Sequence, residues 1–205
     1  MKATTMTKID KLLSLLRARG HERFDGEVVT HLEHALQCAM LAERAGGEDP
    51  LMAAALLHDI GHLLSGCVGA PSARSVDDQH EQLGANALDE IFGPAVALPV
   101  RWHVAAKRCL AADRMYYRLL SVESRRSLAL QGGAMEPTER AVFLAQPCAA
   151  DALRLRQWDE AAKRARLKTP SLDHFATILS RVASANEAKV LQPVPSAVAI
   201  PWNVL

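Results

Sequence analysis

The sequence predicts an all-α protein, and three features support that fold class. Of the 205 residues, 49% are hydrophobic and only 4% are aromatic, and the richness in Ala and Leu is typical of packed helices. Apolar residues recur three and four positions apart along most of the chain, which is the spacing of one helix face. Gly and Pro separate these segments, and the sequence contains no strand-rich region and no internal repeat.

Capping residues, Pro and Gly divide the chain into successive helices. Thr30 and Glu33 have the spacing of a capping box, and Pro50 follows Asp49 as a helix-starting proline. The predicted helices span residues 7–19, 31–45, 51–64, 80–92, 99–110, 116–130 as one or two short helices, 139–166 with an interruption at Pro147, and 170–185. Residues 65–78, which contain Gly and Pro, are predicted to form a loop.

Length and composition also limit the partners and the location of the protein. We expect one helical domain over residues 1–188 and an extended tail with three prolines over residues 189–205. The formal net charge of +1 argues against nucleic acid as a partner, and no apolar run approaches the roughly 18 residues of a membrane helix. The four cysteines are scattered without a Cys-x-x-Cys pair, which indicates a reducing, cytoplasmic environment.

One apolar segment carries three polar side chains, His58, Asp59 and His62. Burying an ionised Asp beside His costs free energy unless a partner compensates the charge, and a metal ion is a common partner. On a continuous helix His58 and His62 would face the same side, because they are four residues apart. A helix end with hydrogen-bonded core histidines is the alternative, so the interpretation depends on ligands from elsewhere in the chain.

Other residues of metal-binding type lie near the ends of successive predicted helices: His34, His80 and His103. Helices of a bundle project side chains into a shared core, where metal sites are common. The set offers nitrogen and oxygen donors without a thiolate, which suits iron, manganese, magnesium or zinc and disfavours a Cys-type structural zinc site. We therefore predict that these histidines join His58 and Asp59 at a metal site.

A late aspartate is expected to complete the set, and the sequence offers two, Asp151 and Asp159. They are eight residues apart in one helical segment, a little over two turns, so both side chains could face the same way. Helical spacing alone does not separate them.

The order of His34, His58–Asp59 and a late Asp resembles the HD superfamily of metal-dependent phosphohydrolases. Further motifs resemble the mixed-valent di-iron HD oxygenases, which cleave the carbon–phosphorus bond of hydroxylated phosphonates. These motifs are Gly26–Glu27, Leu32–Glu33–His34, His80, His103 with Lys107, Leu130–Gln131–Gly132–Gly133, and Leu155–Arg156–Gln157–Trp158–Asp159 with Lys163. The resemblance covers about residues 24–163, most of the chain.

The resemblance implies an HD-domain helical bundle that holds two iron ions in a mixed-valent Fe(II)/Fe(III) state. The family's last ligand lies in an aromatic-Asp pair followed by Lys four residues later, a pattern that selects Asp159 over Asp151. Asp59 is then expected to bridge the two ions. The expected terminal ligands are His34, His58 and Asp159 for one iron, and His80 and His103 for the other.

The resemblance also implies a phosphonate pocket with six contacts: Phe24, Glu27, His62, Lys107, Ser124 and Arg156. Lys107 and Arg156 lie within one turn of proposed ligands and suit a phosphonate, although surface cations are the alternative interpretation. Ser127 competes with Ser124, and Glu27 either meets a substrate amino group or caps a helix. Phe24 departs from the family pattern. The family's type member has at this position a Tyr that can ligate iron, whereas Phe has no oxygen with which to do so.

The predicted activity is that of an iron-dependent dioxygenase. Such an enzyme uses O2 to cleave the carbon–phosphorus bond of a 1-hydroxyphosphonate, releasing phosphate and a carboxylate, which is glycine for 2-amino-1-hydroxyethylphosphonate. Its partners would be the small-molecule phosphonate and O2, and no catalytic group beyond the metal centre is required of the chain. An HD phosphohydrolase acting on a phosphate ester or nucleotide is the alternative, and a ligand-binding HD domain without activity is a third hypothesis.

Overall fold

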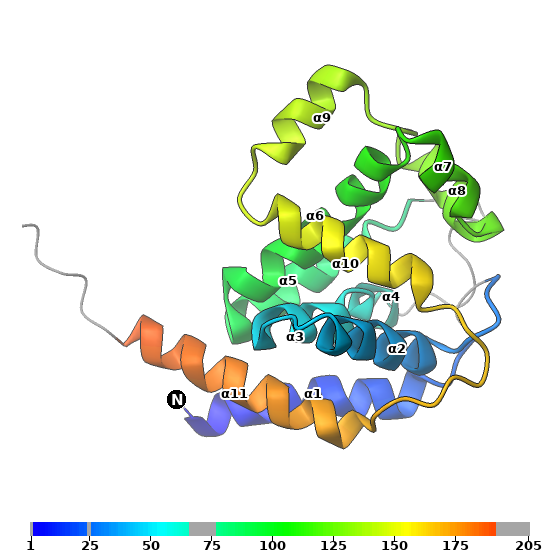
Figure 1. The fold of residues 1–205 in the computed structure, drawn as a ribbon. Coiled ribbons are helices and arrows are strands. Elements are labelled where there is room, and N and C mark those ends of the chain that lie inside the picture. The colour runs from blue at the N-terminus through cyan, green and yellow to red at the C-terminus, as the bar shows by residue number, and fades with distance from the viewer. Residues whose placement is uncertain (1, 24–25, 66–76, 192–205) are drawn as a thin grey trace, which may run out of the picture.

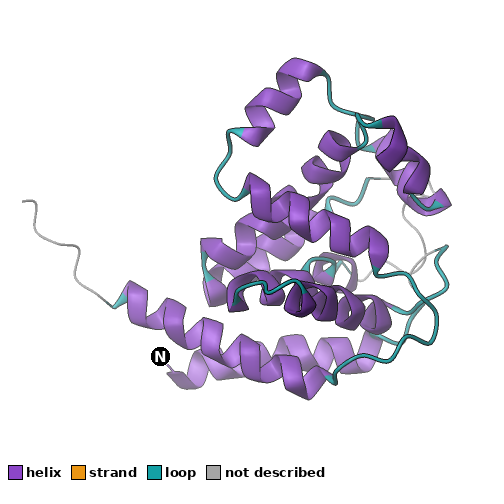
Figure 2. Cartoon of the chain, viewed as in Figure 1, coloured by secondary structure: helices purple, strands orange, loops and turns teal. Residues whose placement is uncertain are grey.

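The computed structural model describes residues 2–23, 26–65 and 77–191, which form eleven helices and no strand (Figures 1 and 2). The predicted all-α fold is confirmed. The helices are α1 (Lys2–Arg19), α2 (His31–Arg44), α3 (Asp49–Leu57), α4 (Ile60–Leu64), α5 (His80–Phe92), α6 (Pro94–Leu110), α7 (Arg114–Leu119), α8 (Val122–Leu130), α9 (Pro137–Leu144), α10 (Ala149–Ala161) and α11 (Leu172–Val190). Within these ranges no helix has the length and apolarity that crossing a membrane requires.

Helix α3 is the centre of the main core. Every residue from Leu51 to Leu57 is buried, and the helix contacts α2, α6, α10 and α11. A helix that is apolar on all sides is stable only where other elements surround it. Its three consecutive alanines, Ala53–Ala55, leave room for the neighbouring helices to approach closely. The last residue of this helix is followed by His58, so the core of the protein directly supports the polar stretch.

The remaining helices are arranged in two groups around α3 (Figure 1). Helices α1 and α11 contact each other and pack on one side, at the bottom of the view. Helices α7, α8 and α9 lie at the opposite end, where two smaller apolar clusters hold them. One cluster centres on Phe143 and Met135, and the other contains Leu120 and Leu128. This second group places α8 near the polar side chains that follow α3.

Two predicted helix starts are confirmed in detail. Thr30 and Glu33 form the full capping box: Thr30 Oγ1 accepts from the Glu33 amide at 3.2 Å, and the Thr30 amide donates to Glu33 Oε2 at 2.8 Å. Helix α3 begins at Asp49 with Pro50 in its first turn. Both signals are local, because they depend on hydrogen bonds within four residues.

The prediction of one continuous helix over residues 51–64 is wrong, because the helix has a break at His58 and Asp59. The imidazole Nδ1 of His58 lies 3.0 Å from the Ala55 carbonyl oxygen and competes for an acceptor of the helix backbone. After the break, α4 packs against the start of α5 so closely that a Cβ on Gly61 would stand 2.0 Å from the His80 carbonyl oxygen. The break therefore turns the chain toward α5.

The start predicted near Pro99 is also wrong, because α6 begins at Pro94 and contains Pro99. A proline at this position removes one backbone hydrogen bond, to the carbonyl of Ala95. Ala95 is exposed, so water can satisfy that carbonyl. The loss of this one hydrogen bond therefore costs the helix little stability.

Three further helix ends differ from the prediction. Helix α1 begins at Lys2, before residue 7, and α11 continues past residue 185 to Val190, so the predicted tail begins inside its last turn. Residues 192–205 lie outside the described ranges. Helix α10 ends at Ala161 instead of continuing to Arg166, because side chains of α2 bind the backbone that follows. Gln37 Nε2 donates to the Arg164 carbonyl at 2.9 Å, and Gln37 Oε1 accepts from the Arg164 amide at 3.1 Å.

The close approach of α4 to α5 gives a test of the fold. Replacing Gly61 with Ala should lower the free energy of unfolding by about 1–3 kcal/mol, as expected for overpacking against a backbone atom. Gly84→Ala is the matched control, because a Cβ there would make ordinary contacts of 3.4 Å or more. Urea denaturation of both variants measures the difference, and equal stabilities would contradict the close packing.

Candidate metal centre

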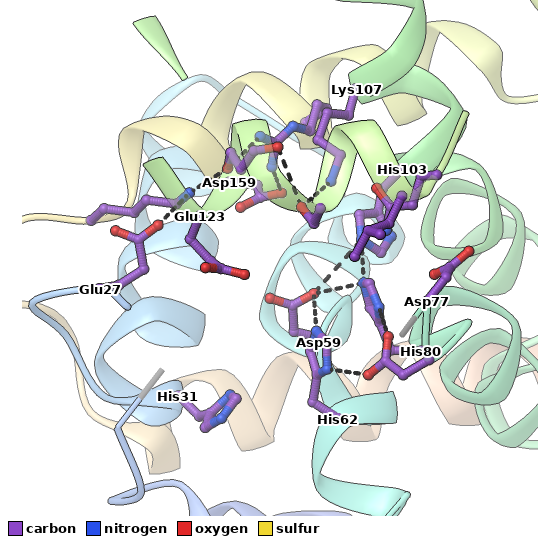
Figure 3. A pocket seen from close by; sticks show the side chains of 17 residues that line it. Glu27, His31, Asp59, His62, Asp77, His80, His103, Lys107, Glu123 and Asp159 are labelled. Carbon is purple, nitrogen blue, oxygen red and sulfur yellow. Dashed lines mark hydrogen bonds and ion pairs between the residues drawn. The ribbon is translucent and has the colours of Figure 1, made fainter. Parts of the chain in front are cut away.

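Six side chains from five parts of the fold meet at one point. They are His34 on α2, His58 and Asp59 at the break between α3 and α4, His80 at the start of α5, His103 on α6 and Asp159 near the end of α10. The four histidines and Asp159 are buried, and Asp59 is 14% exposed at its side chain. Figure 3 shows Asp59, His80, His103 and Asp159 around one cavity. The structure therefore brings together all the residues predicted as ligands.

The first group consists of His34, His58, Asp59 and Asp159. The Nε2 atom of His34 lies 3.2 Å from His58 Nε2, 3.5 Å from Asp59 Oδ2 and 3.3 Å from Asp159 Oδ1. His58 Nε2 lies 3.3 Å from Asp59 Oδ2. Two ligands about 2.1 Å from one ion stand roughly 3.0–3.4 Å apart at octahedral or tetrahedral angles. These separations therefore suit a single metal ion.

The second group consists of His80, His103 and the other oxygen of Asp59. The Nε2 atoms of the two histidines are 3.1 Å apart, and each lies 3.6 Å from Asp59 Oδ1. Asp59 thus directs Oδ2 to the first group and Oδ1 to the second. A carboxylate in this position can bridge two cations and reduce the repulsion between them.

The hydrogen bonds of the imidazoles define which nitrogen is available to a metal. The Nδ1 atoms of His34, His58, His80 and His103 lie 2.9, 3.0, 2.9 and 2.7 Å from the oxygens of Ala162, Ala55, Asp78 and Val100. Carbonyl and carboxylate oxygens only accept, so each Nδ1 carries the proton and the neutral ring keeps a lone pair on Nε2. Two such lone pairs face each other in each group, and a cation between them removes the repulsion. The donor set therefore fits metal ions.

The two late aspartates occupy different places. Asp159 is 4% exposed and faces the first group. Asp151 is 43% exposed at its side chain and lies 3.7 Å from Arg154, away from the histidines. Burial raises the pKa of Asp159, but the charge of Arg156 outweighs it and helps to hold the pKa well below the usual range. Asp159 is therefore a carboxylate at neutral pH.

A cavity opens on the two ligand groups, and three buried or partly buried cations line it: Lys107, Arg156 and Lys163. Figure 3 shows Lys107 at the wall of this cavity. Lys107 is 6% exposed and donates to Ser127 Oγ at 2.8 Å. Burial and the positive charge of Arg156 lower the pKa of Lys107 to about 7. An anion in the cavity would favour the protonated form of this lysine, because it supplies the missing countercharge.

Arg156 is the centre of a buried hydrogen-bond network. Its guanidinium contacts Asp159 Oδ2, donates to Glu160 Oε2 at 2.5 Å and Ser124 Oγ at 3.2 Å, and donates to Tyr116 Oη at 3.1 Å. Asp159 thus has one oxygen on the histidines and the other on Arg156. Arg156 fixes the carboxylate and also presents its charge to the cavity wall.

The other predicted substrate contacts that the structure describes also line the cavity. Glu27 Oε1 accepts from Ser121 Oγ at 2.6 Å and pairs with Lys163 Nζ at 3.1 Å. Ser124 and Ser127, the two competing serines, both face the cavity, the first toward Arg156 and Lys163 and the second toward Lys107. His62 stacks on His80, with ring centroids 3.8 Å apart. Phe24 lies outside the described residues.

Several residues in or beside the cavity were not predicted as site residues. Asp78 lies between His62 and His80, and its signal in the sequence is only its place two residues before His80. Glu160 and Lys163 lie four and seven residues after Arg156, a spacing that puts all three on one face of the segment, although charge at that spacing is also typical of a surface helix. His31, which has no partner pattern in the sequence, also lines the cavity.

Comparisons with known proteins identify the family. Residues 31–150 match the model of the HD domain. The chain is 43% identical over 166 residues to (1-hydroxy-2-(trimethylamino)ethyl)phosphonate dioxygenase (glycine-betaine-forming) of Leisingera caerulea, covering 80% of this chain and 84% of the relative. It is 40% identical over 179 residues to hydroxymethylphosphonate dioxygenase of Gimesia maris, covering 86% and 89%. The chain belongs to the HD-domain hydroxyphosphonate dioxygenase family.

A more distant relative aligns with a similar share of the chain. An uncharacterized protein of Acanthamoeba polyphaga mimivirus is 29% identical over 185 residues, covering 89% of this chain and 84% of the relative. The HD-domain match ends at residue 150, so Arg156, Asp159 and Lys163 lie beyond it. The alignments with the two dioxygenases include 80% and 86% of this chain. Membership of the oxygenase family therefore rests on these relatives, and the HD domain supplies the shared core.

The network around Arg156 gives a test of the site's construction. Arg156→Ala should lower the free energy of unfolding of the metal-free protein by about 3–5 kcal/mol, because it leaves Asp159 as a buried carboxylate without its cationic partner. Arg154→Ala, two residues away, is the control: Arg154 is exposed and its loss should cost about 1 kcal/mol or less. Chemical denaturation checks both, and similar losses would contradict the buried role of Arg156.

Proposed function

We propose that this protein is an iron-dependent dioxygenase that cleaves the carbon–phosphorus bond of a 1-hydroxyphosphonate. The observation that carries the proposal is the pair of ligand groups that share Asp59 and open on a cavity whose lining includes Lys107, Arg156 and Lys163. Its identity to two hydroxyphosphonate dioxygenases supports the same chemistry. The overall reaction converts the hydroxyphosphonate and one O2 into a carboxylate and phosphate, with the substrate carbon oxidised and O2 reduced.

In this proposal two iron ions occupy the two groups. His34, His58 and Asp159 would hold one ion, His80 and His103 the other, and Asp59 both. The donor set of imidazole nitrogens and carboxylate oxygens suits iron, and the redox change needed for a mixed-valent Fe(II)/Fe(III) pair excludes magnesium and zinc from this role. When bound, iron would supply the activation of O2. The described cysteines are free, which agrees with the expected cytoplasmic location.

The protein's own residues would bind and orient the phosphonate. Lys107 and Arg156 are proposed to face its oxygens, because their charges line the cavity beside the ligand groups. Ser124 and His62 add hydrogen-bonding groups on two sides. The burial of these side chains strengthens their interaction with an anion, because little water competes.

Glu27 is proposed to lie near the other end of the substrate. In the absence of ligand it pairs with Lys163 and Ser121, so a cationic substituent would have to share this carboxylate with Lys163. A substrate without a cation leaves the pair intact. The choice among amino, trimethylammonio and unsubstituted hydroxymethyl forms therefore depends on the strength of the Glu27–Lys163 pair.

Product analysis tests the proposed function. Protein loaded with Fe(II) without oxygen should, after oxygen is admitted, consume one O2 per phosphate released from hydroxymethylphosphonate or its 2-amino or 2-trimethylammonio derivative. Partly oxidised protein should give the EPR signal of a mixed-valent iron pair. Under argon no phosphate should appear. Phosphate release from a phosphate ester under argon, without oxygen-dependent cleavage of any of the three phosphonates, would instead identify a phosphohydrolase.

Removing the buried lysine tests its proposed contact. Lys107→Ala should raise KM for the phosphonate at least 10-fold, because a hydrogen bond to a charged group contributes about 1.5–3 kcal/mol. Its iron content should match that of the wild type, since Lys107 contacts Ser127 and not a proposed ligand. Arg101→Ala is the control on the same helix, because Arg101 binds Gln82 and Asn86 on α5. An unchanged KM in the lysine variant would remove Lys107 from the substrate site.

A further inference from the structure

Asp78 stands between two functional histidines that belong to different parts of the site. Its Oδ1 lies 2.9 Å from His80 Nδ1, and its Oδ2 lies 2.7 Å from His62 Nδ1. The side chain is 11% exposed, so water competes little for either contact. His80 is a candidate metal ligand and His62 a candidate substrate contact, and one carboxylate binds both.

The geometry makes Asp78 an acceptor toward each ring. A carboxylate has no proton to donate at neutral pH, so both Nδ1 atoms must donate to it. This assigns the Nε2 atom of His80 to the second ligand group, where it faces His103 at 3.1 Å. It also turns the Nε2 atom of His62 toward Asp59 Oδ1, at 4.0 Å, and the cavity.

Contacts outside the carboxylate favour the same arrangement. The rings of His62 and His80 are stacked, with planes 19° apart, so a rotation of either ring would disturb the other. His62 directly follows Gly61, which lies against the His80 carbonyl, so the two rings come from closely packed segments. Gln79, between Asp78 and His80, has φ of 48°, which turns the chain so that Asp78 faces the ring that follows it.

We propose that Asp78 is a positioning residue that couples the second metal ion to the phosphonate contact. It acts through His80 by fixing the tautomer and orientation of a metal ligand, and through His62 by aiming that ring at the substrate. Removing a hydrogen-bond partner of a metal-binding histidine typically lowers metal affinity or activity 10- to 100-fold. The inference rests on the proposed function for its substrate half, whereas its metal half is independent of the reaction.

His62, Asp78 and His80 also satisfy the spacing of a metal-binding group. The Nδ1–oxygen distances of 2.7 and 2.9 Å are those of hydrogen bonds to a charged acceptor. A third ion there would also require the His80 ring to lose its Nδ1 proton while its Nε2 faces the second group. The distances therefore favour a shared hydrogen-bond acceptor over a third metal site.

Metal binding tests the first half of the proposal without any reaction. The full-length wild type, Asp78→Ala and Asp78→Asn are titrated with Fe(II) alone under argon, and the bound metal is measured. The first ion should bind each protein within about threefold of the wild-type affinity, whereas the second should bind both variants about 10- to 100-fold more weakly. Unchanged affinity for the second ion, or a third ion bound by the wild type, would overturn the proposal.

Matched variants keep this result interpretable. Asp77→Asn removes a neighbouring exposed carboxylate whose Oδ1 accepts from the Gln79 amide at 3.4 Å, and it should retain the second ion. Asp78→Asn is nearly the size of Asp78, so it carries the test if Asp78→Ala does not fold, as judged by circular dichroism. Its amide group can accept from only one of the two rings.

A double-mutant cycle on KM tests the second half. At saturating Fe(II), His62→Ala and Asp78→Ala should each raise KM for hydroxymethylphosphonate, and the double variant should resemble His62→Ala. Fully additive effects would show that Asp78 does not act through His62 and would overturn this half. If the wild type cleaves no hydroxyphosphonate, the proposed function fails, while the Fe(II) titration still decides the role of Asp78.

Discussion

The site depends on the repulsion between imidazole lone pairs that face each other in a buried space. His34 and His58 form one such pair, and His80 and His103 form the other. Each ring is held in this orientation by an acceptor on its far side, so rotation cannot relieve the repulsion. A metal ion between the two rings, or a proton on one of them, removes this repulsion. The packing of α2, α3, α5 and α6 thus forms two donor groups that fit metal ions.

Carboxylates and cations balance this site from two sides. Asp59 and Asp159 face the histidines, and Arg156 compensates Asp159 from behind. Lys107 adds positive charge to the cavity wall, where its burial is costly without an anion. An anion such as a phosphonate would relieve the cost of burying the Lys107 charge, and this relief would contribute to the free energy of binding.

The sequence by itself determined the fold class and the donor atoms. The helical periodicity, the capping box at Thr30 and the proline at position 50 depend on neighbours within four residues, so local patterns are sufficient to predict them. The candidate ligands were recognisable by residue type and their place on successive helices, and the choice of Asp159 came from a family motif. The structure brings these donors within 4 Å of their neighbours.

Only the tertiary structure decided how those donors are oriented. The break at His58–Asp59 arises where α4 packs against α5 at Gly61, a contact between segments that sequence periodicity cannot register. The place of Asp78 between two rings and the pairing of Glu27 with Lys163, 136 positions later, likewise depend on long-range packing. Residue type is a local property of the chain, whereas the direction of a lone pair is set by acceptors from distant helices.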